Sequence, residues 1–271
     1  MHATMARFSS GAQTHSHKIA ATQAQSMTTD THTRPILSVV IPMYNEVDNV
    51  EPLLTEVRQA LDGQVDYEIL AVDDCSSDDT AAEILRQRRQ NSRVRLIQHR
   101  YNCGQSAGLR SGILAAHGDW IATLDGDGQN DPADIPSLYA AATGAEAPDM
   151  VCGIRHRRQD SRVKLLSSRI ANAIRRRLLD DHVTDTGCGL KLFRRQTYLQ
   201  LPYFDHMHRF LPALVQMHKG RITSVNVNHR PRRHGQSKYG INNRLWVGIV
   251  DLTGVMWLKR RCRLPQSDEV S

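Results

Sequence analysis

The chain lacks the features that define several large classes of protein. It has no run of about 20 apolar residues, the length that a membrane-spanning helix needs. Its five cysteines are scattered without CxxC spacing, which argues against a disulfide framework or structural zinc site and favours a reducing cytoplasm. Aromatic residues make up only 5% of the sequence, and no helix-turn-helix, zinc or RNA-recognition signature is present. Nucleic acid is therefore not an expected partner.

Residues 1–34 lack apolar periodicity and consist largely of Ala, Thr, Ser, Gln and His. We expect a disordered tail here. No hydrophobic stretch of secretory length follows the first residue, so a signal peptide is not expected. An organellar transit peptide is the weaker alternative, because the tail has few acidic residues but also few arginines.

Positive charge is abundant, with a net charge of +7. The sign calls for an acidic partner but does not choose among nucleic acid, anionic lipid and a phosphorylated substrate. Much of it lies in 155–177, where nine Lys or Arg stand against one acid, Asp160. This run is either a solvated face or, as we favour from its position, a binding surface for a phosphate-rich ligand.

From residue 36 to 154 the sequence alternates strand-like apolar runs with helix-like segments. This alternation predicts a mostly parallel sheet with helices on both faces, and in such sheets ligands bind outside the carboxyl ends of the strands. The expected strands are 36–41 (stopped by Pro42), 68–72, 94–97, 120–124 and one beginning at 150, and the expected helices are 47–61, one ending at about 89, and 106–117.

Polar clusters follow three of these strands, and the most informative is Asp125-Gly126-Asp127. Two carboxylates one residue apart point the same way if the backbone stays extended. Hard oxygen donors at the exit of a buried strand suit Mg²⁺ or Mn²⁺, especially when substrate phosphates complete the coordination. An ordinary Asp-Gly-Asp-Gly turn is the alternative. The other two clusters are Tyr44-Asn45-Glu46 and Asp73-Asp74.

Four motifs in order resemble glycosyltransferase family 2, most closely the branch of dolichol-phosphate mannose synthase and undecaprenyl-phosphate sugar transferases. The resemblance covers about 37–263. The motifs are Val40-Ile41-Pro42-Met43-Tyr44-Asn45-Glu46, Val72-Asp73-Asp74-Cys75-Ser76-Ser77-Asp78-Asp79-Thr80, Asn102-Cys103-Gly104-Gln105-Ser106-Ala107-Gly108 and Leu124-Asp125-Gly126-Asp127-Gly128-Gln129.

The resemblance implies a nucleotide-diphospho-sugar transferase (GT-A) fold and a donor site at the strand ends. One carboxylate of Asp73 and Asp74 is implied to contact the base or ribose, and the sequence does not choose between them. The resemblance further assigns Pro42, Tyr44 and Glu46 to the nucleotide, Asp125, Asp127 and Gln129 to the metal and diphosphate, and Arg209, Arg233 and Lys238 to the donor more weakly.

The acceptor side is also implied by the resemblance. Arg155 and Arg169 match two arginines that hold the lipid phosphate, a task that suits the planar guanidinium. Asp185, in a further similar segment, is a candidate catalytic residue together with Asp127, and it either orients the acceptor or acts as a base. A phosphate monoester is already largely anionic near neutral pH, so a strong base is hardly required.

The implied activity is metal-dependent, inverting transfer of a sugar from a GDP- or UDP-linked donor to a polyprenyl (dolichyl or undecaprenyl) phosphate, with Mg²⁺ or Mn²⁺. One alternative keeps the donor site but takes a saccharide or other hydroxyl acceptor, which would need Asp185 as a general base. A remote alternative, from another class, is a basic nucleic-acid-binding protein.

Many relatives continue into transmembrane helices where this sequence ends, so we expect a peripheral protein at the cytoplasmic face of the membrane. Either a basic face and the segment 246–263 bind the membrane surface, or a separate membrane-anchoring subunit recruits the protein. A terminal helix packed on the domain is the equally weighted alternative. The expected organisation is a tail (1–34), a catalytic domain (35–244) and an amphipathic or interfacial helix with a tail (245–271).

Two remaining residue types are expected to be ordinary. The histidines 206, 208 and 229 are interpreted as surface or site-lining residues more readily than as metal ligands. Cys188 is expected to be a small packing residue rather than a nucleophile.

Overall fold

The computed structural model describes residues 35–155, 173, 175–180, 183–232 and 241–263, without the side chains of 241–246. These residues belong to one compact unit, which spans 34–271. The expected disordered tail lies outside the described residues. The division at residue 244 into a catalytic domain and an interfacial helix stays a prediction.

A seven-stranded sheet forms the centre of the unit, in the order β3-β2-β1-β4-β6-β5-β7. All neighbouring strands run parallel except at β6 (Lys191–Arg194), which is antiparallel to both β4 and β5. The expectation of a mostly parallel sheet is therefore confirmed. The other strands are β1 (Leu37–Met43), β2 (Tyr67–Asp73), β3 (Val94–Gln98), β4 (Trp120–Thr123), β5 (Met150–Arg155) and β7 (Ile222–Val227).

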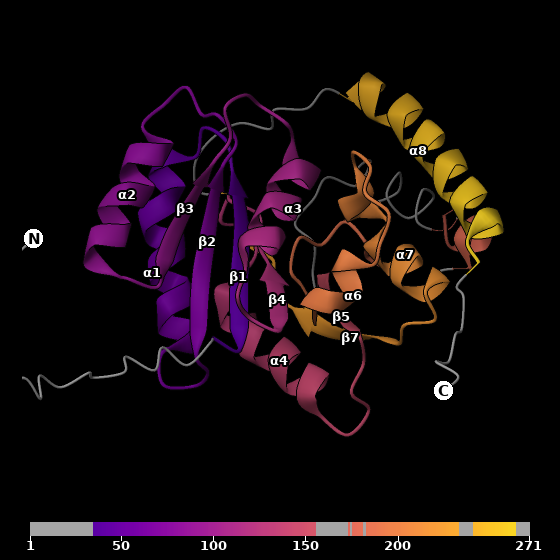
Figure 1. The fold of residues 1–271 in the computed structure, drawn as a ribbon, viewed down its shortest axis with the longest axis horizontal. Helices are drawn as coiled ribbons and strands as arrows, with labels where there is room; N and C mark the ends of the chain where they lie inside the picture. The colour runs from indigo at the N-terminus through magenta and orange to yellow at the C-terminus, as the bar shows by residue number, and fades with distance from the viewer. Residues whose placement is uncertain (1–34, 156–172, 174, 181–182, 233–240, 264–271) are drawn as a thin grey trace, which may run out of the picture. The chain divides into compact units, whose positions relative to one another are not determined.

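Helices cover both faces of this sheet (Figure 1). Side chains alternate along β1, so that Val39 and Ile41 join the core beneath α1 while Val40 joins the core beneath α3. Strands buried on both faces need apolar runs rather than alternating patterns, which is why β1 and β2 are readable in the sequence. The helices are α1 (Val47–Leu61), α2 (Thr80–Gln90), α3 (Gln105–Ala115), α4 (Ile135–Thr143), α6 (Arg195–Leu199), α7 (Leu211–Met217) and α8 (Ile241–Arg261), with 3-10 turns η1 (Pro132–Asp134) and η2 (Met207–Arg209).

Strand β1 does not stop at Pro42, as the sequence analysis expected, but continues to Met43. The carbonyl of Val40 accepts a hydrogen bond from the N–H of Leu124, at the end of β4. Pro42 is two residues after Val40, so its backbone N and C=O also face β4. The last pair between β1 and β4 is at Val40, so Pro42 lies beyond the paired part of β4. The N–H that proline lacks is therefore not needed by the ladder, and the expectation was wrong for that reason.

Helix α8 packs on the unit through its middle and its carboxyl end. Val255 is buried, and the ammonium of Lys259 donates to the carbonyl of Leu179 at 2.6 Å. On another side of the helix, Val250 and Trp257 are largely exposed. Within the described residues, no helix is both long and apolar enough to cross a bilayer.

Candidate active site

The carboxyl ends of β1, β2 and β4 meet at one edge of the sheet because the three strands are parallel and in register. The segments that follow β1 and β2 are tied together there. The N–H of Asn45 donates to Ser76 Oγ at 2.9 Å, and the N–H of Glu46 donates to Thr80 Oγ1 at 2.9 Å. Tyr44, expected at the nucleotide, is partly exposed at this edge.

Asp73 and Asp74 end β2 with buried carboxylates. Asp73 accepts hydrogen bonds from the N–H of Ser76 and the amide of Gln98, both at 3.2 Å. Asp74 accepts from the N–H groups of Cys103 and Gly104, both at 2.8 Å. Asp74 thus fixes the entry to α3, whose N-cap Gly104 has φ of 84°, a backbone conformation that favours glycine.

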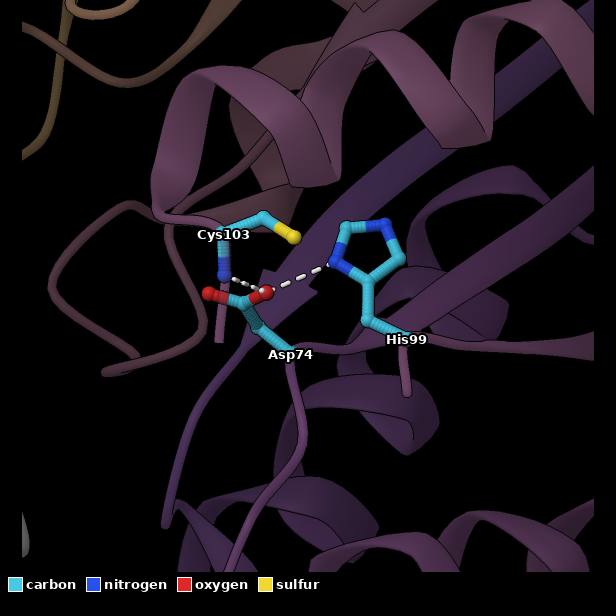
Figure 2. Close-up of side chains that lie close together, drawn as sticks. All are labelled: Asp74, His99 and Cys103. Carbon is cyan, nitrogen blue, oxygen red and sulfur yellow. Dashed lines mark hydrogen bonds and ion pairs between the residues drawn. The ribbon is translucent and has the colours of Figure 1, made fainter. Parts of the chain in front are cut away.

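Asp74, His99 and Cys103 come together as a group whose ligand atoms lie within 4.8 Å of one another (Figure 2). Nδ1 of His99 is 2.7 Å from Asp74 Oδ1, and its Nε2 is 2.8 Å from Ser111 Oγ. Both ring nitrogens and both carboxylate oxygens therefore already have partners within the protein. We interpret the group as a structural junction between β2, the loop after β3, and α3.

Asp125 follows β4, and its carboxylate lies between two elements. Its Oδ1 accepts from the amide of Gln105 at 2.7 Å, on the first turn of α3. Its Oδ2 rests on Gly189, where an added Cβ would come within 2.1 Å, so any larger residue would displace the Asp125 carboxylate. Burial, and secondly the negative charge of Asp127, raise the pKa of Asp125 to about 6.

Asp127 points to the same edge but has different partners. Its Oδ1 accepts from the N–H of Gln129 at 3.1 Å, and its Oδ2 is 2.6 Å from Nη2 of Arg232. The side chain of Gln129 donates to the carbonyl of Arg230 at 3.5 Å. The Asp-Gly-Asp segment is therefore more than a solvated turn, since both carboxylates have partners from distant segments, Gln105 for Asp125 and Arg232 for Asp127.

Several residues surround Asp125, and one of them, Lys191, was not singled out by the sequence analysis. A cavity of about 20 Å³, enough for one water molecule, is lined by Asp125, Gln105, Lys191 and His208 among others. Lys191 is buried, and its ammonium donates to the carbonyl of Cys188. Burial, more than nearby cations, holds the pKa of His208 well below its usual value, and its Nδ1 lies 2.7 Å from Ser106 Oγ.

His208 is therefore a neutral, site-lining residue, in keeping with the expectation for the histidines. Arg209 lies next to it in η2, and after burial its positive charge contributes to lowering the pKa of His208. Cys188 is fully buried in the core, which agrees with a packing role.

The acceptor candidates give one strong pair. Arg155, at the end of β5, forms a bidentate ion pair with Asp185: Nε is 2.8 Å from Oδ2, and Nη2 is 2.7 Å from Oδ1. The backbone N–H of Arg155 also donates to Asp185 Oδ2, at 3.2 Å. The structure thus brings these two candidates together. Arg169, Arg233 and Lys238 lie outside the described residues.

The chain is similar to a known protein family over the part that carries this site. The sequence profile described as glycosyl transferase family 2 matches residues 38–201, which include the strand-end carboxylates. The chain belongs to this family. The family assignment made from the four motifs is thereby confirmed.

Curated proteins resemble the chain over most of its length. Dodecaprenyl-phosphate galacturonate synthase of Rhizobium johnstonii is 38% identical over 232 residues, 83% of this chain and 67% of that protein. Undecaprenyl-phosphate 4-deoxy-4-formamido-L-arabinose transferase of Edwardsiella ictaluri is 38% identical over 78% of this chain and 65% of that protein. The chain spans about two thirds of the length of these relatives.

Solved structures share the fold at lower identity. Glucosyl-3-phosphoglycerate synthase from Mycobacterium tuberculosis, in complex with Mg²⁺ and uridine diphosphate, aligns with a TM-score of 0.62 and 21% identity, over 86% of this chain and 81% of that one. The complex of the same enzyme with Mn²⁺, uridine diphosphate and phosphoglyceric acid gives a TM-score of 0.62 and 20% identity. The expected nucleotide-diphospho-sugar transferase fold is confirmed.

Proposed function

We propose that the protein transfers a sugar from a nucleoside-diphosphate donor to a polyprenyl phosphate, with Mg²⁺ or Mn²⁺ at the donor diphosphate. The observation that carries the proposal is the pair of carboxylates, Asp125 and Asp127, just past the carboxyl end of β4, where burial and secondly the charge of Asp127 raise the pKa of Asp125. The relatives named above, whose acceptors are dodecaprenyl or undecaprenyl phosphate, support the acceptor class.

The donor site fits a divalent cation. Asp125 and Asp127 offer hard oxygen ligands, and a cation between them would offset both the burial of the Asp125 carboxylate and its repulsion by Asp127, which together raise its pKa. We assign Asp125 and Asp127, with Gln129, to hold the ion. When bound, it would neutralise negative charge on the departing nucleoside diphosphate.

The rest of the donor site is assigned to the ends of β1 and β2. We keep Pro42, Tyr44 and Glu46 for the nucleotide. Between Asp73 and Asp74, we favour Asp73 for the base or ribose, because Asp74 has the greater number of internal hydrogen bonds. Both UDP- and GDP-linked donors fit this assignment.

On the acceptor side we assign Arg155 to the phosphate, with Asp185 as the residue that orients it. Both carboxylate oxygens of Asp185 are bonded to the Arg155 guanidinium, which fixes the orientation of its planar fork at the end of β5. An acceptor phosphate oxygen attacks the anomeric carbon as the bond to the donor diphosphate breaks, with inversion. The attacking oxygen is already anionic, so no base is required.

A polyprenyl-phosphate acceptor would bring the reaction to a membrane surface. We propose that the protein is peripheral at the cytoplasmic face, where the exposed Val250 and Trp257 of α8 and its basic end, 259–261, approach the lipid. A separate membrane-anchoring subunit is compatible with the same arrangement. Because α8 also packs on the unit, it would bind the lipid surface while staying in contact with the rest of the protein.

The function is tested with labelled UDP- and GDP-sugars, a short polyprenyl phosphate and Mn²⁺, by measuring butanol-extractable product. Product should form with at least one donor, disappear with chelator, and require Asp127, with Asp79→Asn as the control because Asp79 is exposed and makes no side-chain cap. Transfer to a free saccharide but to no polyprenyl phosphate would instead establish the hydroxyl-acceptor alternative. Folded protein that gives no product with any donor overturns the proposal.

A further inference from the structure

A thiol, an imidazole and a carboxylate converge where the end of β2 meets the loop that joins β3 to α3. Ligand atoms of Asp74, His99 and Cys103 lie within 4.8 Å of one another, and Figure 2 shows the Cys103 sulfur pointing toward the imidazole, beside the Asp74 carboxylate. The carboxylate is buried, whereas Cys103 is only half-buried. The group can therefore be reached from solvent on one side.

A second thiol, that of Cys75, lies at the same place. The Cys75 thiol donates to the carbonyl of Arg100 at 3.6 Å. The Cys103 thiol donates to the next carbonyl along the chain, that of Tyr101, at 3.3 Å. Cys75 has φ of 61°, a left-handed conformation that is uncommon for a non-glycine residue and costs free energy. Strain of this kind, held by the surrounding fold, is typical of functional positions.

Hydrogen bonding alone does not call for this set of side chains. A thiol is a weak donor, and a hydroxyl would serve a purely hydrogen-bonded junction better. Thiolate, imidazole and carboxylate are instead the ligands that Zn²⁺ takes in proteins, whereas the all-oxygen set of Asp125 and Asp127 suits Mg²⁺ or Mn²⁺. Ligand atoms around a tetrahedral Zn²⁺ lie about 3.3–3.8 Å apart, so side-chain movements of about 1 Å would bring the group to this geometry.

His99 has the surroundings of a metal-binding histidine. Its Nε2 lies 2.8 Å from Ser111 Oγ, so Nε2 can carry the ring proton and leave Nδ1 as the ligand atom. A cation would replace the proton that joins Nδ1 to Asp74 Oδ1, 2.7 Å away. The N–H groups of Cys103 and Gly104 donate to the Asp74 carboxylate and would hold it in place as a ligand.

We propose that Asp74, His99 and Cys103, with Cys75 as the fourth ligand, form a binding site for Zn²⁺ or a chemically similar divalent cation. This site is separate from the donor metal of the proposed function and does not depend on it. A bound cation would tie the end of β2 to the entry of α3, where Gln105 bonds Asp125. Binding to the folded state alone should stabilise the protein.

The site is tested in reduced, chelator-treated protein by titration with Co²⁺, which substitutes for Zn²⁺ and reports its ligands by absorption. Saturating Mg²⁺ is present throughout to occupy the carboxylates of Asp125 and Asp127. One equivalent of Co²⁺ should give a thiolate-to-cobalt charge-transfer band and the strong visible bands of tetrahedral coordination. Zn²⁺ should remove both bands and raise the midpoint of thermal unfolding.

Single variants assign the ligands. Cys103→Ser and His99→Gln should each weaken Co²⁺ binding about 100-fold, because loss of a ligand costs at least as much as loss of a residue that orients one. Ser111→Ala, which removes the partner of His99 Nε2, should weaken it about tenfold. Cys75→Ser should lower the charge-transfer band, because one of two thiolates is gone. Cys262→Ser removes another half-buried thiol and should change neither band.

Several results would overturn the inference. Folded wild-type protein without the charge-transfer band would do so, as would a band that survives in a folded variant of Cys103 or His99, or one that is lost in Cys262→Ser. The Cys103 and His99 variants remove different ligands, so one of them that folds, as judged by thermal unfolding in chelator, is enough for the test. Co²⁺ binding at this site without any sugar transfer would contradict the proposed function and leave this inference intact.

Discussion

The carboxylates at the end of β2 differ from those on the other side of the site in what holds them. Asp73 and Asp74 are bonded by backbone N–H groups, an amide and a histidine. Asp127 and Asp185 also accept one backbone N–H each, but unlike Asp73 and Asp74 they form ion pairs with the guanidinium groups of Arg232 and Arg155. An incoming metal ion would compete with Arg232 for Asp127, whereas an incoming phosphate would be a second anionic ligand of Arg155. The carboxylates at the end of β2 are thus held by the fold, and the two on the other side of the site lie in ion pairs that charged ligands can perturb.

The largest effect expected from breaking this arrangement is at Asp127. Asp127→Asn keeps the shape but removes the charge, and kcat should fall about 10³-fold, in the range seen when electrostatic stabilisation of a transition state is lost. Product formation with saturating Mn²⁺ measures it. Asp79→Asn should retain wild-type kcat, and equal loss in both variants would contradict a specific role for Asp127.

Replacing Asp74 should lower the stability of the fold more than replacing Asp127 or Asp185 does. Asp74→Ala leaves two backbone N–H groups and His99 without their acceptor, so the free energy of unfolding should fall by about 3 kcal/mol. Urea unfolding measures the change. Ser111→Ala removes only the outer partner of His99 and should cost about 1 kcal/mol, so a similar loss in both variants would argue against the junction.

The Arg155–Asp185 pair should show its role in acceptor use. Arg155→Gln should raise KM for polyprenyl phosphate roughly 30-fold, because charge-assisted hydrogen bonds to the phosphate are lost, while KM for the donor changes little. Asp185→Glu should recover most of the activity lost in Asp185→Asn if orientation of Arg155 is what matters. A kcat of Asp185→Asn that falls to the background rate, with KM unchanged, would instead indicate a general base.

The smallest effect concerns the pH dependence of metal binding. Asp125, with a pKa of about 6, is mostly ionised at pH 7 and mostly protonated at pH 5. The affinity for Mn²⁺ should therefore fall about tenfold between these values, as calorimetry at both pH values would show. Affinity that is flat down to pH 5 would contradict the raised pKa.

The same raised pKa affects the stability of chelator-treated protein, with a definite sign. An acid whose pKa is higher in the folded state favours folding while protonated, and this contribution is lost as pH rises through the folded pKa. The stability gained by Asp125→Asn relative to wild type should therefore grow between about pH 4 and pH 6 and stay constant above.

The sequence predicts the nucleotide side better than the reacting side, for physical reasons. Strands β1 and β2 are continuous apolar runs because they are buried on both faces. Strand β6 begins with the buried Lys191 and ends with the exposed Arg194, and β7 is only partly buried, so neither carries a readable pattern. The motifs that contain the acids follow strands whose carboxyl ends the structure brings to one edge of the sheet.

The hydrogen-bond partners of those acids could not be predicted from the sequence. Arg232 meets Asp127 across 105 residues, and no local spacing links them. The family resemblance assigned the neighbouring residue, Arg233, to the donor site, and it did not indicate Arg232 as a partner of Asp127. Gln105 was part of a recognised motif, but its hydrogen bond to Asp125 depends on how α3 is held by Asp74.

The most direct test of the account is a crystal of the protein grown with Mn²⁺ and UDP or GDP and measured for anomalous scattering. The account predicts a manganese peak shared by the carboxylates of Asp125 and Asp127, with the diphosphate on its other side. Bound nucleotide with the manganese held elsewhere would contradict it.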